Sequence, residues 1–148
     1  MGSEWREGTL ADIAEVLMGQ SPPGVDCSKE TIGPPLLNGP TEFGSHSPAA
    51  TQYTRSPKRM SKDGDLLFCV RGSTTGRMNW ADQEYALGRG LAAIRHHDPE
   101  CQQYLRGLID YRLDELLSVA TGSTFPNVSR NQILGIELSI PPLPEQKA

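Results

Sequence analysis

Three stretches of the sequence carry side chains that could bind a polyanion. The first, "QYTRSPKR" (52–59), brings Gln, Tyr, Arg and Lys together, and "RGSTTGR" (71–77) has an arginine at each end of a run of Gly, Ser and Thr. The third, "GSTFPNVSR" (122–130), adds hydroxyl groups, an amide and another arginine. Hydroxyls and backbone N–H groups can hydrogen-bond phosphate oxygens, whereas Arg, Gln and Asn side chains can also hydrogen-bond base edges. The residue types therefore indicate nucleic acid as a candidate ligand, although many ordinary loops have a similar composition.

The distribution of charge allows the same interpretation. The chain has a formal net charge of -4. Residues 53–95 contain eight Lys or Arg and four Asp or Glu, a net of +4, and the other residues contain six and fourteen, a net of -8. An acidic protein with one basic segment can face an anionic polymer on one side. Strands crossed by salt bridges would give the same counts, so charge alone leaves both interpretations open.

Acidic residues leave open a competing interpretation, a small metal-dependent nuclease or hydrolase. Such enzymes gather carboxylates around metal ions, and Asp63, Asp65 and Glu84 are the local candidates. No lysine stands two residues after Glu84, and Asp63 and Asp65 fit a polar turn before a strand. The stretch "RGSTTG" lacks the lysine that follows the second glycine of a nucleotide-binding P-loop. We therefore expect neither a catalytic centre nor a cofactor.

The cysteines and histidines do not predict a metal site. Cys27, Cys69 and Cys101 are widely spaced and form no C-x-x-C pair, so neither a disulfide framework nor a zinc knuckle is expected. Cys69 lies within "LLFCV" and is interpreted as a small core residue. His96 and His97 are adjacent and would point apart on regular structure, with no third ligand at metal spacing.

The strands that would position the polar stretches are short. Fifteen Gly and twelve Pro indicate frequent turns. Hydrophobic patterns predict buried strands at 65–72 and 76–81, joined by a tight turn at "RGSTTG", and a third at 85–95 that glycines interrupt. Residues 20–64 are too long for an ordinary connection, and only "PPLLNG" and "QYT" within them fit short strands. This region is expected to form a functional layer of loops or to be partly mobile.

The helical patterns complete the expected fold. Residues 10–17 follow the capping residue Thr9 and predict a short helix, or an entry into a strand, that stops at Gly19. Residues 100–120 have an apolar face at helical spacing and predict the dominant amphipathic helix, which Gly122 would end. Ser129 can cap a short helix over "RNQIL", and "GIELSI" fits a strand. The predicted fold class is α+β: a single mixed domain with a twisted β-sheet of short strands and long loops plus this one long helix.

Seven motifs follow one another along the chain and carry a resemblance. In order they are "WREGTLADIA", "GQSP", "LLNG", "DGDLLFCVRGSTTG", "GRGLAAI", "GSTFPNVSRNQI" and "IPPLPEQ". Each is weak alone, but together they extend from Trp5 to Gln146. This order resembles the target recognition domain of type I restriction–modification specificity subunits.

The resemblance implies a function and a set of partners. A specificity subunit of this family looks like two such domains held apart by two helices, and each domain reads one half of a split DNA target. The implied partners are double-stranded DNA, the methyltransferase (M) and restriction (R) subunits that carry the catalysis, and a second recognition domain or second copy joined through spacer helices. The chain would then be a non-catalytic recognition component without a membrane contact. A protein-interaction scaffold that does not bind DNA is a further alternative, beside the nuclease or hydrolase.

The resemblance also divides the polar residues into two groups. A segment shared by proteins that read different targets cannot choose the bases, so the motif residues are assigned to phosphate contacts. The idiosyncratic stretch 38–60 is the better candidate for base reading. The phosphate or backbone candidates are Arg71, Ser73, Thr74, Arg77, Arg89, Ser123, Thr124 and Arg130. The base-reading candidates are Asn38, Gln52, Tyr53, Arg55, Lys58 and Arg59.

The two ends of the chain are expected to lie outside the recognition domain. Residues 1–4 are interpreted as a cloning remnant, residues 5–140 as the recognition domain, and residues 141–148 as a Pro-rich hinge into a truncated spacer helix. Consecutive prolines cannot extend a sheet, whereas Pro144 and Glu145 suit the first turn of a helix. No apolar run approaches the length of a membrane span and the start has no signal-peptide core, so a cytoplasmic location is predicted.

Overall fold

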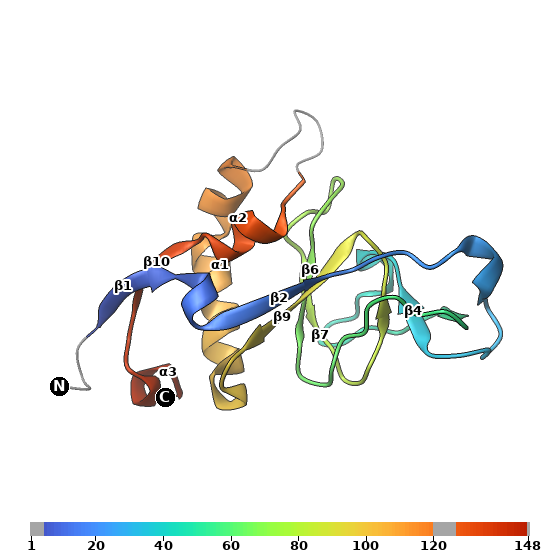
Figure 1. Ribbon diagram of the computed structural model, residues 1–148, viewed down its shortest axis with the longest axis horizontal. Helices are drawn as coiled ribbons and strands as arrows, with labels where there is room; N and C mark the ends of the chain where they lie inside the picture. The colour runs from blue at the N-terminus through green and yellow to red at the C-terminus, as the bar shows by residue number, and fades with distance from the viewer. Residues whose placement is uncertain (1–4, 120–126, 148) are drawn as a thin grey trace.

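Three β-sheets and one long helix build the protein, seen here in a computed structural model that describes residues 5–119 and 127–147 (Figure 1). The central sheet has the strand order β2-β9-β6-β7, the peripheral sheet the order β3-β5-β4-β8, and β1 pairs with β10. The strands are β1 (Arg6–Thr9), β2 (Ala14–Met18), β3 (Cys27–Ser28), β4 (Pro35–Leu37), β5 (Gln52–Thr54), β6 (Leu66–Cys69), β7 (Met78–Trp80), β8 (Ala86–Leu87), β9 (Leu91–His96) and β10 (Glu137–Ile140). Neighbours in the central sheet are antiparallel, whereas β4 and β8 are parallel.

The helices are few and lie mainly in the second half of the chain. They are α1 (Gln102–Ser118), α2 (Arg130–Leu134) and α3 (Leu143–Lys147), with the single 3-10 turns η1 (Leu10–Asp12), η2 (Gly24–Asp26), η3 (Pro40–Glu42) and η4 (Pro99–Cys101). Figure 1 shows β1, β10 and α3 at one end of an elongated molecule and the peripheral sheet, with β4 labelled, at the other. The predicted α+β class with one dominant helix is confirmed.

The central sheet is buried on both faces, which explains the uninterrupted apolar run of β6. Because side chains alternate along a strand, Leu66 and Phe68 point to one face, where they pack with Leu105 and Ile109 of α1. Leu67 points to the other face and joins the second apolar cluster, between the central and peripheral sheets. The sheet therefore forms the middle layer between the long helix and the peripheral sheet.

Local signals in the sequence set several element boundaries. Gly72 and Gly76 have φ angles of 91° and 100°, which favour glycine, and they shape the turn between β6 and β7. Ser129 caps α2: its Oγ accepts from the Gln132 N–H at 3.1 Å, and the Gln132 side-chain oxygen accepts from the Ser129 N–H at 2.8 Å. The predicted strands, their tight turn and both helices are confirmed.

Other boundaries differ from the prediction. Residues 10–17 form the turn η1 and then β2, so the alternative of an entry into a strand is the correct one. The paired strand β3 was not predicted, because it is only two residues long and is recognisable only through its pairing with β5. Residues 20–64 form much of the peripheral sheet rather than loops alone. The expected helix end at Gly122 lies outside the described residues.

The Pro-rich end of the chain contacts the rest of the protein. Gln146 is buried, and its Oε1 lies 2.7 Å from the Nε2 of His96. Lys147 pairs with Asp98 at 3.2 Å and Glu100 at 3.0 Å. The boundary at residue 140 and the hinge role of 141–148 stay predictions, and residues 1–4 and 148 lie outside the described ranges. Within those ranges, no helix has the length and apolar character that crossing a membrane requires.

Candidate nucleic-acid interface

Four separate segments meet at one end of the central sheet. Residues 19–21 follow β2, and the Gly19 N–H donates to the Leu91 carbonyl at 2.8 Å. Residues 71–77 form the turn after β6, and residues 88–90 precede β9; these two segments are joined by the Val70 N–H, which donates to Gly90 at 2.9 Å. Together with residues 127–130, they form what we call the basic end.

A backbone hydrogen bond holds the fourth segment at the basic end. The Val128 N–H donates to the Val70 carbonyl at 2.8 Å, which places residues 127–130 beside the turn between β6 and β7 (Figure 1). The four segments of the basic end contain four arginines and no Asp or Glu. The sheet thus concentrates positive charge from arginines that are spread between residues 71 and 130 of the sequence.

The arginines of the basic end differ in how they are held. Arg71, Arg77 and Arg89 are exposed, and within the described residues none of them forms an ion pair. Arg130 is tied to the protein, because its Nε donates to the Val16 carbonyl at 3.0 Å. By contrast, Arg95 pairs with Asp65 and Glu15 elsewhere in the sheet. As far as residues 5–119 and 127–147 show, three guanidinium groups are therefore available to an external anion.

Hydroxyl groups accompany these arginines. Ser73 is exposed, and Thr74 is half-buried with its Oγ1 3.6 Å from the Cys69 sulfur. Both residues lie in the turn that Gly72 and Gly76 shape, so they sit between Arg71 and Arg77 at the tip of the basic end. Ser123 and Thr124, the other predicted phosphate contacts, lie outside the described residues.

A groove in the peripheral sheet adjoins the basic end. It has a volume of about 520 Å³, and its polar lining includes Lys29, Asn38, Thr51 and Gln52. Asn38 connects the two surfaces, because a Cβ atom on Gly90 would stand only 2.5 Å from the Asn38 carbonyl oxygen. We call this feature the amide groove.

The two amides of the groove are free of protein partners. Within the described chain, neither the Asn38 nor the Gln52 side chain forms a hydrogen bond to another protein group. By contrast, the Gln102 side chain bonds the backbone of His96, Gly64 and Ile94. Free amide side chains at a concave surface can offer paired donors and acceptors to a ligand.

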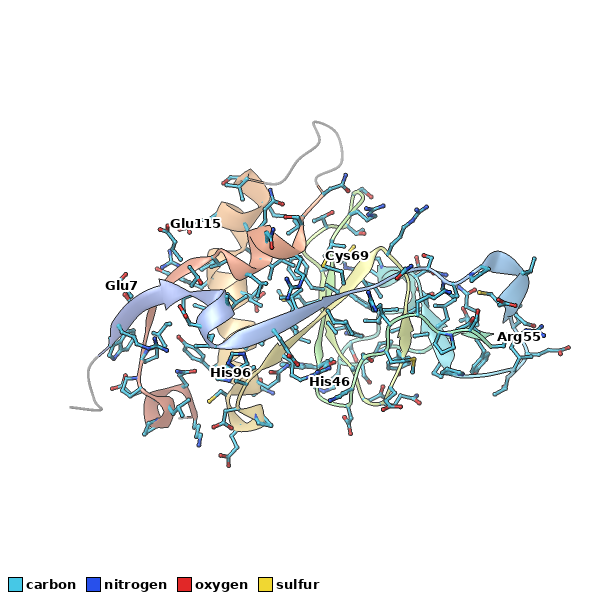
Figure 2. All side chains as sticks on the ribbon, viewed as in Figure 1. Glu7, His46, Arg55, Cys69, His96 and Glu115 are labelled. Atoms are coloured by element: carbon cyan, nitrogen blue, oxygen red, sulfur yellow. The ribbon has the colours of Figure 1, made fainter. Side chains whose placement is uncertain are left out.

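The structure places some of the predicted base-reading residues in the amide groove and the others outside it. It brings Asn38 and Gln52 together in the amide groove. Arg55 lies instead at the tip of the peripheral sheet, away from Cys69 beside the basic end, and pairs with Asp26 at 3.7 Å (Figure 2). The remaining candidates do not line the groove: Tyr53 is half-buried within β5, and Lys58 and Arg59 are exposed beyond it.

Sequence reasoning missed two polar residues of the groove, Lys29 and Thr51. Lys29 lies in a stretch rich in Pro, Gly and Ser with no strand pattern, and its position depends on the pairing of β3 with β5. No pattern in the sequence could have shown this, because the pairing joins residues far apart in the chain.

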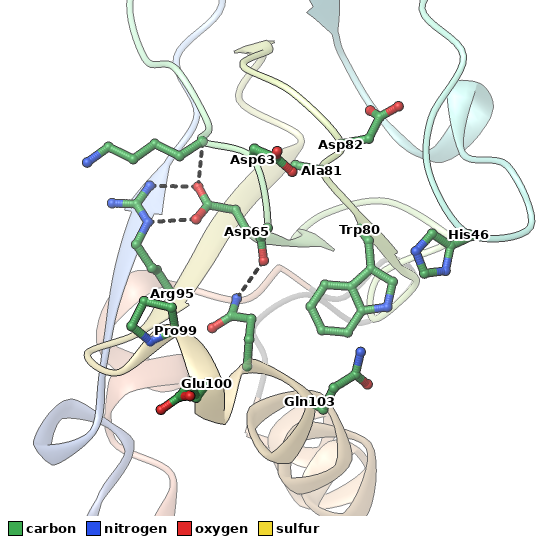
Figure 3. A pocket seen from close by; sticks show the side chains of 13 residues that line it. His46, Asp63, Asp65, Trp80, Ala81, Asp82, Arg95, Pro99, Glu100 and Gln103 are labelled. Atoms are coloured by element: carbon green, nitrogen blue, oxygen red, sulfur yellow. Dashed lines mark hydrogen bonds and ion pairs between the residues drawn. The ribbon is translucent and has the colours of Figure 1, made fainter. Parts of the chain in front are cut away.

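The acidic candidates for a nuclease site lie at the opposite end of the central sheet. Asp63 and Asp65 line a separate cavity of about 620 Å³, which Glu84 does not reach (Figure 3). Asp65 is buried and accepts from Arg95 Nε and Nη2, both at 2.6 Å, and from the Lys62 N–H at 2.8 Å. Its carboxylate therefore serves a structural ion pair. In the described ranges, no three His, Cys, Asp or Glu residues are grouped as metal ligands.

Comparisons with known proteins find a matching family model and a curated relative. The model of the family described as "Type I restriction modification DNA specificity domain" matches residues 2–148. The putative type I restriction enzyme MjaX specificity subunit of Methanocaldococcus jannaschii is 33% identical over 135 residues, which cover 90% of this chain and 32% of that protein. The chain thus spans about a third of this curated relative.

Solved structures share the fold. The HsdS subunit from Thermoanaerobacter tengcongensis superposes with a TM-score of 0.85 at 29% identity, over 99% of this chain and 36% of that one. A chain from a study of the assembly and conformational transition of the type I R-M system gives a TM-score of 0.83 at 30% identity, over 97% and 36%. The S subunit from M. genitalium, at 17% identity and a TM-score of 0.68 over 96% and 36%, shares the fold alone.

Proposed function

This chain belongs to the type I restriction modification DNA specificity domain family, and from that premise we propose that it recognises one half of a bipartite duplex DNA target. The observation that carries the proposal is the basic end: exposed Arg71, Arg77 and Arg89 on two neighbouring turns, without an acidic residue among them, beside the amide groove. This combination supplies both kinds of contact that a DNA reader needs.

The basic end binds the phosphate backbone of the DNA. Guanidinium groups form bidentate hydrogen bonds with phosphate oxygens, and the hydroxyls of Ser73 and Thr74 can add neutral ones. Arg130 contributes through the guanidinium nitrogens that Val16 leaves free. These contacts position the protein on the duplex but carry no sequence information.

The amide groove reads the bases. Asn and Gln side chains recognise adenine through its N6 and N7 atoms, which face the major groove. In the part of the chain that the structure describes, the side chains of Asn38 and Gln52 have no hydrogen-bond partner, so they need break no such bond to do this. Tyr53, Arg55, Lys58 and Arg59 follow Gln52 in the sequence without lining the groove, and they serve as outer contacts to DNA.

The roles proposed for the partner subunits and for the second half-site follow from the family. The domain itself is non-catalytic, and methylation and cleavage belong to the methyltransferase and restriction subunits of a type I system in the cytoplasm. Residues 141–148 lead into a spacer helix, and a second recognition domain or second copy beyond it reads the other half-site. The structural ion pair of Asp65 argues against the nuclease alternative.

The test is a selection from random duplex DNA with this chain, followed by sequencing of the bound fraction. We expect a short enriched sequence whose retention falls steeply with added salt. Bound DNA without any enriched sequence would reduce the function to non-specific DNA binding, and DNA cleavage in Mg²⁺ would favour the nuclease.

A further inference from the structure

Lys29 lies beside Gln52 on the wall of the amide groove. The pairing of β3 with β5 places Cys27 opposite Thr54 and Ser28 opposite Tyr53. The next positions in this register are Lys29 and Gln52, and both residues line the groove. Cβ atoms of directly opposite residues are about 4.5–5.5 Å apart, so the two side chains can work on neighbouring groups of one ligand.

The backbone around Lys29 is held in place. Ser28 Oγ accepts from the Glu30 N–H at 3.0 Å, which closes a turn with Lys29 in its middle. The carboxylate of Asp26, three residues earlier, is occupied by Ser56 at 2.8 Å and by Arg55. Among the described residues, no ion pair uses the Lys29 ammonium group. The turn thus fixes the Lys29 backbone, and within the described ranges its ammonium group is left without an ion pair.

This inference rests on the proposed function and deepens it. Phosphate contacts are supplied by the basic end, whereas Lys29 shares its groove with two free amides. A lysine in such a position donates to the O6 and N7 acceptors of guanine, the pattern that distinguishes guanine in the major groove. We propose that Lys29 is a specificity-determining residue that reads a guanine in the half-site, next to the base read by Gln52.

The test compares single variants of this chain on duplexes that differ at one position of the selected half-site. Lys29→Met should reduce the preference for guanine at one position by between about fivefold and about a hundredfold, because one good base contact is lost. Lys29→Arg should keep the preference, since arginine also reads guanine. Lys62→Met is the matched control: it removes the same charge from an exposed lysine at the separate cavity, at the opposite end of the central sheet, and should leave the base preferences unchanged.

The outcomes separate this inference from the function on which it rests. If Lys29→Met weakens binding equally for all sequences, or changes nothing, Lys29 does not read a base and the inference is overturned while the proposed function stands. If wild-type protein shows no salt-dependent binding to duplex DNA, both are overturned. Circular dichroism of each variant checks that the exposed substitution has left the fold intact.

Discussion

Asn38 packs against Gly88 so closely that a Cβ atom on Gly88 would collide with the Asn38 side-chain oxygen. Gly90, on the other side of Arg89, likewise approaches the Asn38 carbonyl. This contact joins the amide groove of the peripheral sheet to the basic end of the central sheet. In the proposed function, the turn that carries Arg89 therefore also sets the position of a base-reading amide.

Gly88→Ala tests this connection. The new methyl group must displace Asn38, so we expect a loss of about 1–3 kcal/mol in the free energy of unfolding and a weaker preference at one position of the half-site. Urea unfolding and binding to single-position DNA variants measure the two effects. Gly39→Ala is the control, because a Cβ there meets nothing within 4 Å and its φ of -172° suits any residue. Wild-type stability and preference in Gly88→Ala would contradict the connection.

A second prediction follows because phosphate contacts are assigned to the basic end and base contacts to the amide groove. Arg71→Ala should weaken binding to all duplexes by a similar factor, whereas Gln52→Ala should change the preference at one position by about 1–3 kcal/mol. Competition binding against a panel of duplexes measures both. Gln103→Ala, an exposed amide on α1, is the control for the loss of an amide. The assignment is reversed if Arg71→Ala shifts the preference and Gln52→Ala does not.

The ion pair of Asp65 with Arg95 makes a prediction about stability rather than DNA binding. Asp65→Asn leaves Arg95 with one carboxylate fewer and breaks a bidentate pair whose acidic partner is buried, so we expect a loss of about 3 kcal/mol in the free energy of unfolding. DNA affinity should be unchanged once the protein is folded. Asp63→Asn removes an exposed carboxylate from the same cavity and should change stability little. A smaller effect from Asp65→Asn than from Asp63→Asn would contradict the role of the pair.

The buried His96 ring makes stability depend on pH. Its Nδ1 accepts from the Asp98 N–H at 2.9 Å, so its Nε2 carries the proton and donates to Gln146. Burial lowers the pKa of His96 below 6.5, an effect that the nearby charge of His97 increases and that Gln146 and Asp98 oppose. The unfolded chain therefore binds a proton more readily than the folded chain, and the free energy of unfolding should fall as the pH drops below about 6.5.

Urea unfolding between pH 7.5 and 5.5 measures this dependence. His96→Gln should flatten the decrease, whereas His97→Gln, a change at an exposed ring, should keep most of it. An identical decrease in wild type and His96→Gln would assign the pH dependence to other groups.

The sequence predicts this fold best where each element carries its own signal. The run "LLFCV", the two glycines of the turn after it and the capping residue Ser129 predict elements that the structure contains. β3 could not be predicted, because two residues cannot show a period and only the pairing with β5 defines them. The same limit applies to every element whose stability comes from distant partners.

The candidate site could likewise be predicted only where its residues are close together in the sequence. Arg71 and Arg77 flank one turn and could be grouped from the sequence, but Arg89 joins them only because β6 and β9 are neighbours. Arg55 looked suited to base reading from its neighbours in sequence, yet it pairs with Asp26 at the tip of the peripheral sheet. Residue types indicate what chemistry a site can perform. The pairing of strands decides which residues lie together in that site.

The salt dependence of DNA binding tests most directly whether the basic end holds the duplex. The triple variant Arg71→Gln, Arg77→Gln, Arg89→Gln should be compared with Arg6→Gln, Arg106→Gln, Arg112→Gln, which has the same net charge but leaves the basic end intact. Fluorescence anisotropy with a labelled duplex over a range of salt gives the slope of log K against log salt, about -0.9 for each phosphate contact. We predict that the first variant loses about two to three units of this slope and most of its affinity, while the second stays close to wild type. Equal slopes in the two variants would contradict the assignment of DNA binding to the basic end.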